Sequence, residues 1–211
     1  MSAGCYHDPI PLYVASPPTF ATEFVGAATA QRRLVRWLDR EWPGELCFIS
    51  SSPLPDLGLC RFRLETPLAF AKRMKHAEPG VLLTLSTPAM ARALTFRNLM
   101  LQTPGMPRWP VIGLANTLSY HEEPQRQLYI ASQALPGDHI VCMTPAVHAV
   151  LSEAMRGAGE LLKVPPSIRL AVIPLGIEIV GRPSEDQRDR VRHELGLKPD
   201  SLLYLTRVSP I

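Results

Sequence analysis

Polar side chains that can bind hydroxyl groups are concentrated at residues 116–123, directly after a short apolar run. Asn116, Ser119 and His121 can each donate and accept hydrogen bonds, as recognition of a sugar or another polyol requires. The same segment also fits the start of a helix, with Ser119 as the N-cap and the two following glutamates complementing the helix dipole. Both interpretations stay open on the sequence, so these three residues are candidates for ligand binding.

Two further candidates stand where an apolar run gives way to a helical pattern. Gly26 opens the helix expected after the first strand, where a residue without a side chain lets the backbone approach a ligand. The alternative is a glycine that is needed only for close packing of the helix on the strand. Thr144 precedes a helix expected at residues 145–157 and fits its N-cap, with ligand contact as a second role.

Motifs of several well-known chemistries are missing from the chain. The sequence contains no HExxH, no GxSxG, no Walker A motif and no GxGxxG, and its four cysteines show no CxxC spacing. We therefore expect no metal site and no bound cofactor. The absence of a cysteine framework also favours a reducing cytoplasm as the location.

Composition describes a soluble globular protein. With 211 residues, 46% of them apolar and 19% charged, the chain can bury a core and is not a disordered polyampholyte. The net charge is only +3, and no basic run is interleaved with aromatic residues, which argues against nucleic-acid binding. No run approaches the ~18 apolar residues of a membrane-spanning helix. Two basic groups, Arg32-Arg33 and Lys72-Arg73 with Lys75, are expected on exposed helix faces, which keeps contact with anionic lipid headgroups or with a polyanionic acceptor open.

Short apolar runs alternate along the chain with longer segments of helical periodicity. The apolar runs predict six strands, at residues 12–15, 46–49, 81–85, 111–114, 139–142 and 169–173. Helices are expected within residues 22–42 and at residues 67–76, 88–98, 122–134 and 145–157. This alternation predicts an α/β fold, a Rossmann-like doubly wound parallel sheet with helices on both faces. Ligands of such folds lie beyond the carboxyl ends of the strands, where the candidate residues fall.

The pattern changes after residue 173. Residues 183–196 have the charge pattern of an exposed helix, Gly196 supplies a C-cap signal, and a new apolar run begins at residue 202. A lone strand at a terminus cannot bury both of its faces, so it predicts the opening of another sheet. We therefore expect two domains, residues 1–180 and residues 181–211, with the second one incomplete.

This C-terminal order resembles the junction between the two Rossmann-like domains of GT-B glycosyltransferases, specifically glycosyltransferase family 4. Three segments match the family in order and spacing: Val172-Ile-Pro-Leu-Gly-Ile-Glu178, Arg192-His-Glu-Leu-Gly-Leu197 and Thr206-Arg-Val-Ser-Pro210. The resemblance is specific over residues 169–211, moderate over residues 109–157 and loose before residue 78. It implies an N-terminal acceptor-side domain, followed by a linker and the first helix and strand of a nucleotide-sugar-binding domain.

The resemblance implies a retaining enzyme that transfers a sugar from a nucleotide sugar to an unknown acceptor. It needs no metal, because arginine and lysine neutralise the leaving diphosphate. Arg207 resembles the family's diphosphate-binding arginine, although Thr206 stands where the family has glycine. Asn116 stands where many members have histidine. The residues that the resemblance and their positions assign to the acceptor cleft are Gly26, Asn116, Ser119, His121 and Thr144.

No residue of this chain can be assigned to catalysis, since the family's donor-domain lysine and paired glutamates would come after Ile211. We therefore expect the polypeptide alone to be inactive, because transition-state binding needs both sides of the cleft. One alternative is a noncatalytic remnant or regulatory domain of GT-B ancestry that binds an acceptor or a partner enzyme. Another is a doubly wound nucleotide-binding protein unrelated to sugar transfer. Some family members touch the membrane surface, which keeps a cytoplasmic, peripheral location open.

Overall fold

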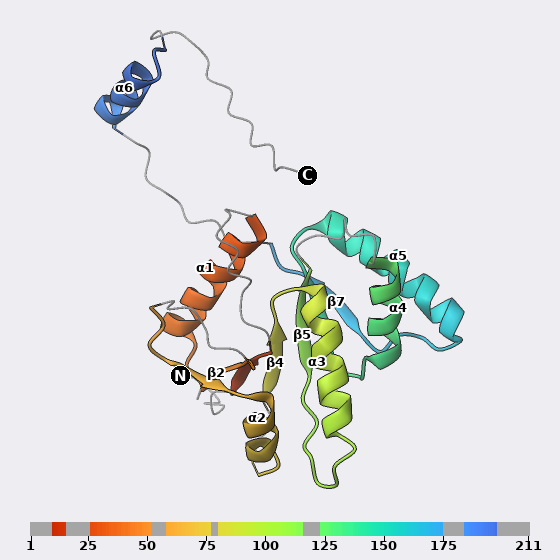
Figure 1. Ribbon diagram of the computed structural model, residues 1–211. Helices are drawn as coiled ribbons and strands as arrows, with labels where there is room; N and C mark the ends of the chain where they lie inside the picture. Colours follow the sequence, from red (N-terminus) through yellow and green to blue (C-terminus); the bar gives the residue numbers. More distant parts are fainter. Residues whose placement is uncertain are drawn as a thin grey trace, which may run out of the picture. The chain divides into compact units, whose positions relative to one another are not determined.

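The computed structural model of the chain describes residues 10–15, 26–51, 58–76, 80–115, 123–174 and 184–197, with residues 26–29 described by their backbone only. The chain divides into two compact units, Met1–Leu175 and Gly176–Ile211. In the first unit seven strands form one sheet, and every pair of neighbouring strands is parallel (Figure 1).

Strands and helices alternate through most of the first unit. The strands are β1 (Leu12–Val14), β2 (Leu46–Ile49), β3 (Phe62–Glu65), β4 (Val81–Thr84), β5 (Val111–Ala115), β6 (His139–Cys142) and β7 (Arg169–Val172). The helices are α1 (Gly26–Glu41), α2 (Pro67–Met74), α3 (Thr87–Met100), α4 (Glu123–Gln133) and α5 (Pro145–Leu162). The second unit contains α6 (Glu185–Glu194). The expected run at residue 202 lies outside the described residues.

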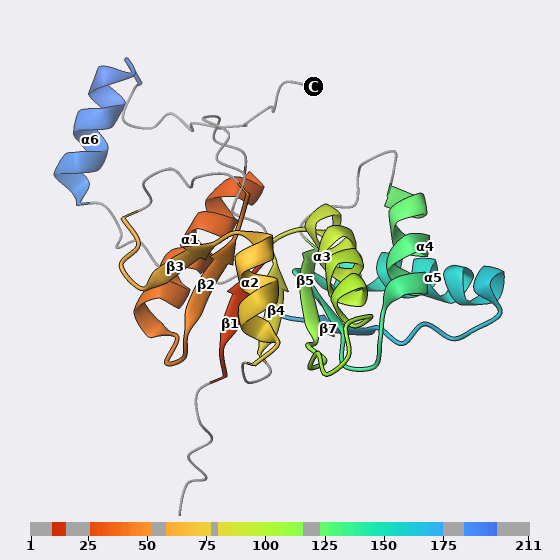
Figure 2. The same ribbon diagram turned by 60° about the horizontal axis from the view of Figure 1, so that its bottom comes forward.

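The predicted α/β fold with a parallel sheet is confirmed, and the two faces of the sheet carry separate cores. Register places Tyr13 beside Cys47 on β2 and beside Leu82 on β4, so these side chains share one face. That face packs against α2, α3, α4 and α5. The opposite face packs against α1 through Val35 and Leu38. Figure 2 shows α2 and α3 on the near side of the sheet.

The structure contains one strand that the sequence did not predict. β3 reads Phe-Arg-Leu-Glu, has no fully buried residue, and pairs at the edge of the sheet with β2 alone. Its Arg63 lies in ion-pair contact with Glu45 and with Glu65. An edge strand of this kind has little apolar pattern, because charged side chains there discourage pairing with other molecules. The prediction of strands depended on apolar runs, and β3 has none, so it was missed.

Three helices begin with the same local arrangement, a hydroxyl N-cap followed by proline in the first turn. In each case the hydroxyl oxygen of the cap accepts a hydrogen bond from the backbone N–H of the residue three positions later. The distances are 3.2 Å for Thr66, 3.3 Å for Ser86 and 3.1 Å for Thr144. Each bond satisfies one of the backbone N–H groups that have no partner within the helix at its start. Proline has no N–H group, and in the first turn this loss removes no hydrogen bond of the helix. These sequences therefore fix where α2, α3 and α5 start.

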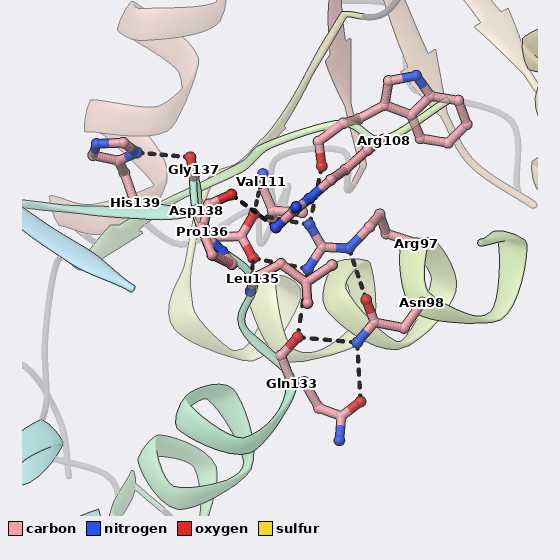
Figure 3. A network of polar contacts seen from close by, with 11 residues as sticks. Arg97, Asn98, Arg108, Val111, Gln133, Leu135, Pro136, Gly137, Asp138 and His139 are labelled. Atoms are coloured by element: carbon pink, nitrogen blue, oxygen red, sulfur yellow. Dashed lines mark hydrogen bonds and ion pairs between the residues drawn. The ribbon is translucent and has the colours of Figure 1, made fainter. Parts of the chain in front are cut away.

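A buried ion pair ties α3 to the amino ends of β5 and β6. Arg97 and Asp138 are both fully buried, and the guanidinium donates to both carboxylate oxygens at 2.9 and 2.8 Å (Figure 3). Asp138 also accepts the backbone N–H groups of Val111 and Leu135, each at 2.8 Å. A paired and hydrogen-bonded charge is tolerated in a core, because its lost hydration is replaced by fixed partners. This network joins three elements at the edge of the sheet opposite to the strand carboxyl ends.

Candidate functional site

The order of the strands places the candidate site. The order is β3-β2-β1-β4-β5-β6-β7, so the chain leaves β1 toward β2 and returns on the other side of β1 to form β4. The connections that follow β1 and β4 diverge at the carboxyl edge of the sheet, and the crevice at such a switch point is where ligands bind in open α/β sheets. The first turns of α1, α3, α4 and α5 lie at this edge, because each helix follows a parallel strand.

One side chain joins the two halves of the switch point. Gln31, in the second turn of α1, donates through Nε2 to the carbonyl oxygen of Leu85, the residue directly after β4, at 2.8 Å. Gln31 is 6% exposed, and its Oε1 has no hydrogen-bond partner among the described residues. The sequence analysis did not single out this residue. A signal existed, since Gln31 shares the helical spacing of the buried Val35 and Leu38 and is the polar member of that stripe.

Buried polar groups also gather at the start of α4. Glu123, its first residue, is 5% exposed, and its carboxylate accepts hydrogen bonds from Arg126 and Gln127. A carboxylate in the first turn complements the positive end of the helix dipole. The interpretation of this segment as a helix start therefore fits the structure at Glu123. Ser119, the N-cap considered in that interpretation, lies outside the described residues.

Thr144 caps α5 as predicted. It is exposed, and its hydroxyl accepts the N–H of Val147 at the carboxyl end of β6. One turn further along, His148 Nδ1 lies 3.5 Å from the hydroxyl of Ser152. This distance is the outer limit for a hydrogen bond and too long for proton abstraction in a fixed pair. His148 therefore gives no sign of an activated serine.

The structure places two of the predicted site residues at the carboxyl edge. Gly26 is the first residue of α1 and Thr144 immediately precedes α5. Asn116, Ser119, His121 and Arg207 lie outside the described residues, and their ligand roles stay predictions. Thr144 is confirmed as a cap, while its contact with a ligand is also still a prediction.

The described cysteines do not supply a nucleophile in the core. Burial raises the pKa of the Cys47 thiol to about 11, with repulsion from Glu65 adding to the effect. Burial also raises the pKa of Cys142. Because the thiolate is the reactive form, both thiols stay protonated and inert at neutral pH. In the described part of the chain, no group of three His, Cys, Asp or Glu side chains could hold a metal ion.

One of the basic groups considered for membrane contact is partly engaged with the protein itself, so the expectation of an exposed helix face holds for Lys72 but not for Arg73. The Arg73 side chain is 27% exposed and donates to Glu65 at 2.9 Å. Its guanidinium also lies 5.3 Å from the centre of the Tyr13 ring. Lys72 beside it is exposed. No helix in the described segments is long and apolar enough to cross a membrane.

Comparisons of the chain with protein-family models, with curated proteins and with solved structures give no match. The structure by itself defines a Rossmann-like α/β protein with a seven-stranded, all-parallel sheet. Its candidate ligand site is the carboxyl edge of that sheet, at the divergence of β1 and β4.

Proposed function

We propose that this chain is the acceptor-side part of a retaining, nucleotide-sugar-dependent glycosyltransferase of the family 4, GT-B type. The observation that carries the proposal is the ordered set of three motifs at residues 172–178, 192–197 and 206–210. The first motif starts at the last residue of β7, the final strand of the Rossmann-like sheet. A sheet of this class followed by a charged helix is the order expected at the junction between GT-B domains.

The helix of the second motif supports the same proposal. α6 begins with Ser184, whose hydroxyl and backbone form a reciprocal capping box with Gln187. It ends before Leu195-Gly196-Leu197, where Gly196 has a φ of 64°, a left-handed conformation that glycine adopts without strain. The leucine-glycine-leucine ending that resembles the family therefore coincides with a helix stop.

In this proposal the carboxyl edge of the sheet binds the sugar acceptor. Gly26 and Thr144 stand at that edge, and Asn116, Ser119 and His121 supply hydroxyl-binding groups. Arg207 binds the donor diphosphate, because a guanidinium fork holds phosphate oxygens at two points. Fixed positive charge of this kind stabilises the leaving diphosphate without a metal ion. The nucleotide sugar and the acceptor are both substrates.

The proposal is tested by comparing two proteins. The 211-residue chain is incubated with labelled nucleotide sugars and a mixture of hydroxyl acceptors, and we expect no transfer. The same chain, extended after Ile211 by a complete GT-B donor domain, is expected to transfer label to at least one acceptor. Robust transfer by the chain alone would overturn the proposal that sugar transfer requires a separate donor domain. Failure of the extended protein to bind nucleotide sugar or transfer label would favour the noncatalytic alternative.

A further inference from the structure

The amide group of Gln31 is a buried polar group near the start of α1, at the carboxyl edge of the sheet. Its Nε2 donates to the Leu85 carbonyl, so it links α1, which follows β1, to the residue that directly follows β4. The residue belongs to a helix on one face of the sheet, and its partner follows a strand of the sheet itself. Gln31 therefore lies at the switch point and joins the connection after β1 to the connection after β4.

The orientation of this amide is determined by its partner. A carbonyl oxygen only accepts hydrogen bonds, so the group that faces Leu85 at 2.8 Å must be the NH₂. Exchanging the oxygen and nitrogen of the amide would place two acceptors against each other. The remaining oxygen, Oε1, is therefore an acceptor, and it is buried without a donor among the described residues. Buried polar atoms are nearly always hydrogen-bonded, so an orphan acceptor indicates a missing donor.

The chemistry of the missing donor follows from the acceptor. A neutral hydroxyl or an N–H group can donate to Oε1, whereas a phosphate oxygen would place negative charge against a carbonyl-type oxygen. Helix starts at a switch point usually favour anions. Gln31 gives the carboxyl edge the opposite preference at this point.

We propose that Gln31 Oε1 accepts a hydrogen bond from a hydroxyl of the ligand and selects a neutral polyol over an anion at the switch point between β1 and β4. The inference rests on the proposed function in one respect, namely that this polyol is the glycosyl acceptor. Gln31 is a binding residue in this proposal and has no role in bond making or breaking.

The side-chain amide signals of Gln31 provide a direct test in the chain as it is. The two N–H resonances are recorded by ¹⁵N NMR and assigned by their loss in Gln31→Met. We expect titration with glycerol or myo-inositol to shift them and titration with pyrophosphate to leave them in place. A shift with pyrophosphate only, or no shift of Gln31 while other resonances respond to the polyol, would overturn the inference. The second of these results would leave the proposed function standing.

The variant adds a second readout. Because Gln31→Met also removes the hydrogen bond to the Leu85 carbonyl, we expect a lower melting temperature whether or not Oε1 binds a ligand. The affinity for myo-inositol should fall about two- to tenfold, as expected for one neutral hydrogen bond. Gln133→Met is the control, since Gln133 is the last residue of α4, at the opposite edge of the sheet, and its Oε1 accepts a hydrogen bond from Asn98. We expect its polyol affinity to equal that of the wild type.

Two outcomes would show a purely structural Gln31. One is a polyol affinity of Gln31→Met equal to that of the wild type. The other is a cross-relaxation signal between the Gln31 amide and a trapped water that persists in saturating myo-inositol. Either result overturns the inference, and neither bears on sugar transfer by the extended protein.

Discussion

Replacing Asp138 by leucine should cost more stability than any surface substitution in this protein. The substitution removes both oxygens that Arg97 binds and leaves a guanidinium buried with no exposed surface. Breaking a buried pair from one side costs about 3–5 kcal/mol. The backbone N–H groups of Val111 and Leu135 also lose their acceptor, each worth about 1–3 kcal/mol when buried. Since such terms do not add fully, we expect a loss of at least about 4 kcal/mol.

Arg97→Met should be less damaging than Asp138→Leu. Without the guanidinium, Asp138 keeps the hydrogen bonds from Val111 and Leu135, so part of its stabilisation survives. We expect a loss of about 3 kcal/mol. The double variant should lose less than the sum of the single variants, because neither charge is then left alone in the core. A coupling energy of about 2 kcal/mol or more would identify the pair as one unit.

Urea unfolding followed by circular dichroism measures these differences. With a slope of about 2 kcal/mol per molar urea, a loss of 4 kcal/mol lowers the midpoint by about 2 M. The control is Arg156→Met, which removes ion pairs between Arg156 and the exposed Glu153 and Glu160. Water screens these exposed charges, so no measurable change is expected. A midpoint shift for Asp138→Leu no larger than for Arg156→Met would refute the reasoning, as would strictly additive effects of the two core substitutions.

Three other predictions concern the titration of the core and the proposed site. The pKa of Cys47 rises from 9.0 to about 11 on folding, so the unfolded chain loses its proton first. The free energy of unfolding, measured by urea titration, should therefore fall between these two pH values by at most about 1.4 kcal/mol per pH unit. Cys47→Ala should weaken that dependence, and an unchanged slope would contradict it. Gly26→Val should abolish acceptor use by the extended protein without changing its melting temperature. The control is Gly157→Val, which should also leave the melting temperature unchanged, because an added Cβ there meets no atom within 4 Å. A clear drop in melting temperature for Gly26→Val alone would favour a packing role. Arg207→Lys should raise the apparent KM for the nucleotide sugar in the extended protein, because the charge remains but the two-point fork is lost; an unchanged KM would remove Arg207 from the diphosphate site.

Local sequence signals located most of the secondary structure. The run Leu46–Ile49 and the run His139–Cys142 have the bounds that the sequence predicted. Helix starts were equally readable, since Thr144-Pro145 combines a capping hydroxyl with a proline that fits the first turn. These signals act between residues close in the chain, so they need no knowledge of the fold. The alternation of such elements was enough to predict a parallel sheet with helices on both faces.

The candidate site was only partly predictable. Gly26 and Thr144 were found because they sit at boundaries between strand and helix patterns, and such boundaries lie at the carboxyl edge of a parallel sheet. Gln31 was missed, since a glutamine in a helix is usually exposed. Its meaning depends on Leu85, 54 residues away, which no local pattern connects to it.

The sequence by itself determined the class of the fold, the positions of the apolar strands and the starts of the capped helices, because short-range sterics and hydrogen bonds decide these features. Only the tertiary structure decided the order of the strands, the pairing of β3 at the sheet edge and the partnership of Arg97 with Asp138. It also decided that Gln31 connects α1 to the Leu85 carbonyl while its own Oε1 has no donor in the part of the chain that the structure describes. The physical reason is that these features depend on which distant residues come together when the two cores form. Once buried, polar and charged groups are costly unless they are hydrogen-bonded or paired, so each needs a partner from another part of the chain.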